Sequence, residues 1–122
     1  MTRYMLMQNY EGGVCDEPMG TWDPADVKAH IDFQIALNDE LTAAGELVDG
    51  QGVAEEITVV VSDGVSRKLD AGPLDRPRLA GYRIVDVESH QRALDIAARS
   101  SAAPGPAGVP LQQPIEVRRI MD

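Results

Sequence analysis

The sequence predicts an α+β sandwich, in which two helices cover one face of an antiparallel sheet. Residues 79–87 have the pattern of a strand, and Glu88-Ser89 then opens an amphipathic helix. An earlier helix begins at Asp23-Pro24, because an acidic N-cap followed by proline is a strong start signal. A strand that runs straight into a capped helix is half of a split β-α-β unit, so these segments define the fold class.

Local signals place the other elements. Gly45 ends the first helix. The β-branched run 57–61 predicts a strand, and Asp63-Gly64 predicts a hairpin turn that returns the chain through residues 65–69. Further strands are expected at residues 3–8, from residue 47 onward, and at residues 115–120. The resulting order, β-α-β-β-(β)-β-α-β, predicts a ferredoxin-like sandwich.

Two stretches rich in proline and glycine are expected to be irregular. Residues 71–78 form a short loop before the long strand. Residues 103–114 are long for so small a domain, and they could form a flap over a pocket, a dimer arm or a plain surface connection.

Composition limits the classes of function. The 122 residues suit one domain, residues 1–122, and the net charge of −9 argues against a nucleic-acid or anionic-membrane partner. The chain has no apolar stretch of membrane-spanning length and no signal-peptide core at its start, so we expect a cytoplasmic protein. The single cysteine, Cys15, lies in an acidic loop that would raise a thiol pKa, so it is a poor candidate nucleophile.

Three polar residues lie within the apolar side of the first helix. On a helical wheel the apolar residues cover an arc of roughly 200°. They are Val27, Ile31, Phe33, Ile35, Leu37, Leu41 and Ala44. His30, Gln34 and Asn38 fall inside this arc at spacings of four, so all three should point toward the sheet. They either form a satisfied polar row in the core or at a dimer interface, or they line a wet cavity.

If there is a cavity, each of these residues has a candidate role. His30 is the candidate catalytic residue, as a general acid or base, and Gln34 and Asn38 would orient the ligand. Tyr82 and Arg83 are further candidate ligand contacts, and they face opposite sides of their strand. Arg83 in a cavity would favour an anionic ligand, but we expect an exposed or dimer-paired arginine. The histidines and carboxylates have no metal-site spacing and no nucleotide motif is present, so neither metal nor cofactor is predicted.

Several segments in order along the chain match one known family. They are Tyr4-Met5-Leu6-Met7, residues 40–48, residues 81–87, residues 92–99 and residues 115–118. These segments resemble the YCII-related proteins, especially the branch named for an Asp-Gly-Pro-Phe (DGPF) motif. The resemblance implies a dimeric α/β barrel and makes His30 the counterpart of a helix histidine in a His/Asp pair. The signature itself is altered to Asp70-Ala71-Gly72-Pro73-Leu74.

These observations leave three kinds of function open. One is a homodimer that binds a small organic molecule, because helices on one face leave the other face of the sheet bare. The second is a cofactor-free enzyme, such as a lactone isomerase, dehalogenase or monooxygenase, with His30 as the proton shuttle. The third is a partner-binding module. An acidic partner of His30 would favour the enzyme, and a filled, dry interior would favour the module.

Overall fold

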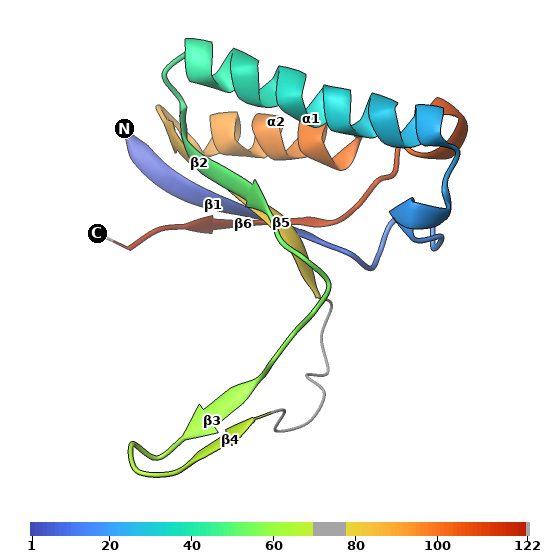
Figure 1. The fold of residues 1–122 in the computed structure, drawn as a ribbon. Coiled ribbons are helices and arrows are strands. Elements are labelled where there is room, and N and C mark those ends of the chain that lie inside the picture. The colour runs from blue at the N-terminus through green and yellow to red at the C-terminus, as the bar shows by residue number, and fades with distance from the viewer. Residues whose placement is uncertain (70–77, 122) are drawn as a thin grey trace.

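The computed structural model describes residues 1–69 and 78–121, in which one strand precedes the first α-helix, four strands lie between the two α-helices and one strand follows the second (Figure 1). The strands are β1 (Thr2–Asn9), β2 (Leu47–Gly52), β3 (Val60–Ser62), β4 (Arg67–Leu69), β5 (Leu79–Val87) and β6 (Ile115–Arg119). The helices are α1 (Pro24–Ala43) and α2 (His90–Ser101), with short 3-10 helices η1 (Met19–Thr21) and η2 (Pro106–Gly108). The predicted loop 71–78 and the altered signature lie, apart from Arg78, outside the described residues.

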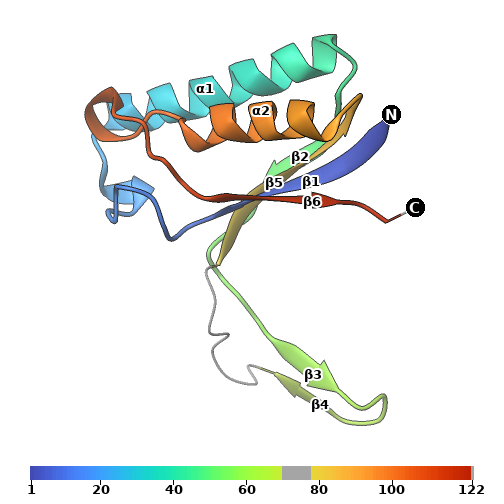
Figure 2. The same cartoon turned by 180° about the vertical axis from the view of Figure 1, so that it is seen from behind.

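Four strands form the main sheet in the order β2-β5-β1-β6, and every neighbouring pair is antiparallel. Both helices lie on one face of this sheet, and the other face carries no helix from the described part of the chain (Figures 1 and 2). The α+β class and the antiparallel sheet with two helices on one face are therefore confirmed. The strand order is compatible with a ferredoxin-like fold.

The predicted helix caps explain where the helices begin. The Asp23 carboxylate accepts a hydrogen bond from the backbone N–H of Ala25 at 2.9 Å, with Pro24 in the first turn. The Ser89 hydroxyl accepts from the N–H of Arg92 at 3.1 Å, which caps α2. Gly45 has a φ of +72°, the left-handed conformation that commonly ends a helix.

The core fills the space between the helices and the sheet. Its buried apolar side chains are Tyr4, Leu6, Leu37, Leu41, Val85, Val87, Ala93, Ile96 and Ala97. On β1 and β5 the buried positions alternate, so odd-numbered positions of β5 and even-numbered positions of β1 face the helices. This alternation determines which polar side chains of the two strands lie beneath α1 and α2.

A second, two-stranded sheet, β3-β4, extends away from the main sheet as an arm (Figure 1). The strand predicted at 57–61 is displaced and shorter, because only residues 60–62 pair with β4. The hairpin itself is confirmed, with Gly64 at a φ of +92° and the Asp63 carboxylate accepting from the N–H of Val65 at 2.9 Å. Val60 and Leu69 are 56% and 53% exposed, so residues 60–69, as far as the structure describes their surroundings, form no core of their own.

Candidate functional site

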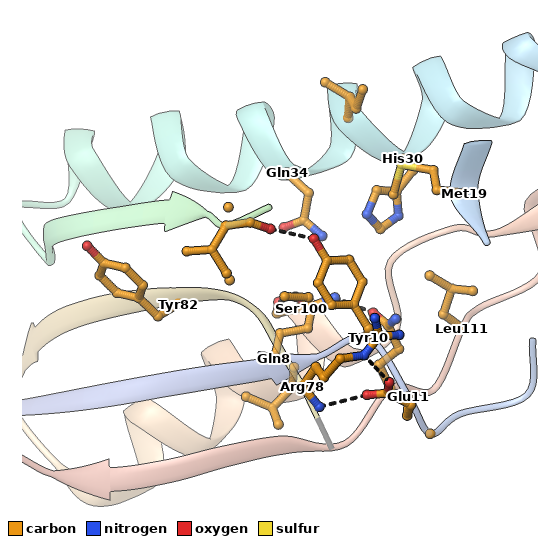
Figure 3. A pocket seen from close by; sticks show the side chains of 18 of the residues that line it. Gln8, Tyr10, Glu11, Met19, His30, Gln34, Arg78, Tyr82, Ser100 and Leu111 are labelled. Atoms are coloured by element: carbon orange, nitrogen blue, oxygen red, sulfur yellow. Dashed lines mark hydrogen bonds and ion pairs between the residues drawn. The ribbon is translucent and has the colours of Figure 1, made fainter. Parts of the chain in front are cut away.

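A cavity of about 760 Å³ lies between α1 and the sheet, where the chain leaves β1 and β2 and enters β6 (Figure 3). Its inner wall is polar. The polar side chains there are those of Gln8, His30, Gln34, Asn38, Arg83 and Ser100. The described residues therefore leave a space with a polar wall beneath α1, whereas a plain interaction module would favour a filled interior.

The polar row of α1 turns toward the sheet, as the sequence predicts. His30 is only 7% exposed, and Gln34 and Asn38 are half-buried; all three line the cavity. The expected apolar arc is too wide, however, because Ile31 and Ile35 are 46% and 53% exposed. They border the cavity, so the space that accommodates the polar row leaves this flank of α1 without protein to pack against.

Arg83 projects from β5 into the same cluster, beneath the helices. It is 8% exposed, so the expectation of an exposed or dimer-paired arginine is wrong. Its Nε donates to Asn38 Oδ1 at 2.7 Å, its Nη1 donates to Ser100 Oγ at 3.0 Å, and its Nη2 donates to Gln34 Oε1. The guanidinium thereby joins β5 to both helices.

All three acceptors of Arg83 are neutral. No carboxylate among the described residues forms an ion pair with it, and burial lowers the pKa of Arg83 because it removes the charge from water. A guanidinium carries five N–H donors, and three are used here. One N–H on each terminal nitrogen therefore has no acceptor among the described residues.

His30 lies beside this cation in a defined tautomer. Its Nδ1 lies 3.1 Å from the backbone oxygen of Pro104, and because a carbonyl only accepts, Nδ1 carries the hydrogen. The edge of Trp22 contacts the imidazole, with the ring centroids 5.8 Å apart. Burial lowers the pKa of His30 and the nearby Arg83 charge lowers it further, while the Pro104 carbonyl opposes them. The imidazole is therefore neutral at neutral pH, with Nε2 as an acceptor.

The acidic partner that would favour an enzyme is not found beside His30 in the part of the chain that the structure describes. Its hydrogen bond there goes to a backbone carbonyl instead. No three His, Cys, Asp or Glu side chains of residues 1–69 and 78–121 are grouped so as to hold a metal ion.

Tyr82 stands apart from the other candidates. It points to the opposite side of β5 from Arg83, as the alternation requires, and its hydroxyl donates to Asp49 Oδ2 at 3.0 Å. Figure 3 shows its ring away from His30 and Gln34, at the outer end of the cavity. The structure thus brings together four of the five predicted site residues and leaves Tyr82 at the margin.

Two of the polar side chains named for the inner wall, those of Gln8 and Ser100, were not predicted. Ser100, 2% exposed, accepts from Arg83 and donates to Gln8 Oε1 at 3.4 Å. Gln8 shares the parity of the buried Tyr4 and Leu6 on β1, so the period-two pattern of the strand could have revealed it. Ser100 continues the i, i+3, i+4, i+7 spacing of the buried Ala93, Ile96 and Ala97 on α2, so the helical period could have revealed it in the same way.

The segment 103–114 forms a wall of the site. Its Pro104 carbonyl holds His30, and its Leu111, 3% exposed, lines the cavity. The Leu111 carbonyl also accepts from the N–H of Val14 at 2.9 Å, which fixes the loop after β1 against this wall. The segment is therefore more than a plain surface connection.

An ion pair and a hydrogen bond close the outer rim of the cavity (Figure 3). Arg78 Nε donates to Glu11 Oε1 at 2.6 Å, and the Arg78 N–H donates to Glu11 Oε2 at 2.7 Å. The Tyr10 hydroxyl donates to the Val53 carbonyl, and the Arg78 guanidinium stacks 5.4 Å from the centre of the Tyr10 ring. These contacts tie the end of β1 to the segments on either side of the arm.

Comparison with known proteins adds no family assignment. No protein-family model matches the chain, and no curated protein matches it in sequence. No helix in the described part of the chain has the length and hydrophobicity that a membrane crossing requires.

Proposed function

We propose that this chain is a YCII-related cytoplasmic homodimer that binds a small organic molecule between α1 and the sheet. Its main support is the convergence of an imidazole, two carboxamides and a guanidinium on one cavity. The volume of about 760 Å³ falls in the range of roughly 300–1,000 Å³ that is typical of small-molecule pockets.

The state of His30 favours binding over proton transfer. A proton shuttle must become an imidazolium during the reaction, and a neighbouring carboxylate would stabilise that charge. His30 has a backbone carbonyl in that place and a buried cation beside it, so its protonated form is disfavoured. The second candidate is a cofactor-free enzyme of the lactone isomerase, dehalogenase or monooxygenase kind. In such an enzyme the unprotonated Nε2 of His30 would act as the base.

Native mass spectrometry of the purified protein tests the pocket. We expect a co-purifying small molecule in the wild type and its loss in His30→Ala, with the oligomeric state unchanged. His90→Ala is the matched control, because this second histidine is exposed at the start of α2 and lies outside the cavity. A ligand retained unchanged in His30→Ala would refute the proposal.

The bare face of the sheet and the arm support the homodimer. Met5 and Ile84 are paired across β1 and β5, and their parity directs them away from the helices. The exposed β3-β4 arm also needs a partner, because an isolated two-stranded hairpin is marginally stable in water. A second copy of the chain would cover both surfaces, and the main sheets of the two copies would together form a dimeric α/β barrel.

Light scattering after size exclusion tests the dimer. We expect twice the chain mass of 13.2 kDa for the wild type and a monomer for Ile84→Asp. Val14→Asp is the control, because this side chain is 60% exposed in a loop away from the bare face. A wild type that stays monomeric at high micromolar concentration would exclude the dimer.

A further inference from the structure

We infer that the ligand of the cavity is a hydroxycarboxylate, with its carboxylate on Arg83 and its hydroxyl on His30. The inference rests on the proposed binding function and adds the chemical class of the ligand. It starts from a guanidinium that is almost fully buried and is satisfied, among the described residues, only by neutral oxygens.

Within residues 1–69 and 78–121, the guanidinium has no counter-charge of the kind that buried cations in proteins have. Removing a charge from water is costly unless an opposite charge compensates, and neutral hydrogen bonds compensate only in part. The terminal nitrogens Nη1 and Nη2 each retain one N–H, and a carboxylate takes two such donors side by side. A carboxylate in the cavity would therefore supply the missing charge in a geometry that arginine favours.

Gln34, Asn38 and Ser100 hold the guanidinium in place before a ligand arrives. Each accepts from a different nitrogen, so the planar group cannot turn away from the cavity without losing a hydrogen bond. A side chain fixed in this way loses little conformational freedom on binding, which strengthens the complex. These three residues act as positioning residues for Arg83.

His30 adds a requirement for a hydrogen-bond donor on the ligand. Its Nδ1 hydrogen is used by Pro104, which leaves Nε2 as an acceptor. An ammonium group could donate to Nε2, but it would stand beside the uncompensated cation of Arg83. A hydroxyl donates without adding charge, so it fits this position better than an amine.

Carboxylates at the mouth of the cavity oppose an anion only weakly. Asp16, Glu17 and Glu55 line the outer part of the cavity and are exposed. Exposed charges are screened over about 8 Å at physiological salt, whereas the buried charge of Arg83 is screened much less. The inner cation therefore determines the preference for charge.

Calorimetric titration of the full-length wild-type protein tests the inference with two matched pairs of probes. They are 3-hydroxybenzoate against 3-hydroxybenzamide, and 3-hydroxybutyrate against 3-hydroxybutyramide. We expect each carboxylate to bind at least tenfold more tightly than its amide. We also expect the hydroxyl-free analogues benzoate and butyrate to bind several-fold more weakly than the hydroxycarboxylates.

Variants assign the preference to one arginine. Arg83→Met should abolish the difference in affinity between the carboxylate and the amide. Arg83→Lys keeps the positive charge but lacks the paired N–H donors of the guanidinium, so it should keep part of this difference. Arg99→Met is the control, because this arginine is half-exposed on α2, pairs with Glu40 and lies outside the cavity. The preference of this variant for carboxylates over amides should match that of the wild type. The wild-type comparison needs no variant and holds even if a variant fails to fold.

The outcomes separate this inference from the proposed function. Equal affinity for carboxylates and amides, or no binding of any carboxylate probe, overturns the inference. A co-purifying molecule that depends on His30 would still support the pocket in either case. Tenfold tighter binding of carboxylates that persists in Arg83→Met overturns the assignment to Arg83.

Discussion

Replacing Gly105 by alanine tests whether the segment 103–111 is packed as a rigid wall of the cavity. A Cβ atom on Gly105 would lie 2.5 Å from Leu111 Cδ2 and 3.0 Å from Leu111 Cγ. Carbon atoms pack best at about 3.5–4.0 Å, so the leucine would have to move by roughly 1 Å. The φ of Gly105 is −108°, which alanine adopts readily, so the substitution introduces crowding without backbone strain.

The surroundings of Leu111 set the size of the effect. It is 3% exposed, and its N–H donates to the Ala103 carbonyl at 3.0 Å, so it cannot swing into solvent. Overpacking of a filled site costs about 1–3 kcal/mol, and we expect the free energy of unfolding to fall by this amount. Because Gly105 directly follows Pro104, the shift should also lengthen the hydrogen bond that His30 Nδ1 donates to the Pro104 carbonyl.

Urea denaturation at a fixed protein concentration measures the effect, with Gly20→Ala as the control. A Cβ on Gly20 meets no atom within 4 Å, so this variant should stay within about 0.5 kcal/mol of the wild type. The double variant Gly105→Ala/Leu111→Ala should lose less stability than the sum of the single variants, because the colliding methyl groups are gone. A cost for Gly105→Ala no larger than that of Gly20→Ala, or full additivity, would refute the packing described for this wall.

Two further predictions concern titratable groups. The pKa of His30 is lowered below 6.5 in the folded chain, so the unfolded chain binds more protons below that pH, and stability falls on acidification. Denaturation between pH 7 and 5 should show this decline in the wild type and a flatter curve in His30→Gln; equal slopes would contradict a buried neutral imidazole. Glu46 forms an ion pair with Arg92 through two hydrogen bonds of 2.7 and 2.9 Å, and its side chain is 13% exposed. Glu46→Gln removes the charge of this pair and should lower the free energy of unfolding by about 1–2 kcal/mol. Asp32→Asn, in an exposed pair, should cost less than about 0.5 kcal/mol, and equal costs would contradict the role of burial.

The fold class could be predicted because its signals are local. The caps at Asp23 and Ser89 and the strand at residues 79–87 depend only on neighbouring residues, and the structure confirms all three. The β3-β4 arm was harder to delimit. A run of β-branched residues indicates strand propensity, whereas the actual bounds depend on which residues find a partner, here 60–62.

The side of the sheet that Arg83 faces could also have been inferred. Arg83 has the same parity as Val85 and Val87, and Asp86 has the parity of Tyr82, so the pattern already favoured a buried arginine. The expectation of an exposed arginine gave more weight to the general preference of charged side chains for water. Arg83 is buried in spite of that preference, because two carboxamide oxygens and a hydroxyl accept hydrogen bonds from its guanidinium.

The partner of His30 could not have been predicted. It is a backbone oxygen 74 residues away, and a backbone carbonyl leaves no mark on the side-chain pattern. The exposure of Ile31 and Ile35 was equally hidden, because a helical wheel assumes packed protein along the whole apolar side. A cavity along part of that side removes this packing, and its position depends on the distant segment 103–114.

The cost of burying Arg83 gives the last prediction. Arg83→Met removes a cation from a site with no counter-charge among the described residues, and replacing buried charges by apolar groups is often neutral or stabilising. Without the guanidinium, Gln34 and Asn38 can form hydrogen bonds with water, because they line the cavity. Ser100 retains its hydrogen bond to Gln8. We therefore expect an unchanged or higher Tm by calorimetry, together with the loss of carboxylate preference.

Val85→Ala is the matched variant for this prediction. Val85 is fully buried two residues along the same face of β5, so its truncation should lower the free energy of unfolding by about 1–3 kcal/mol. If Arg83→Met lowered the Tm more than Val85→Ala does, the guanidinium would be a structural element of the core. If the Tm held while binding changed, Arg83 would be maintained for its ligand, because a residue that adds no stability has no other reason to be buried there.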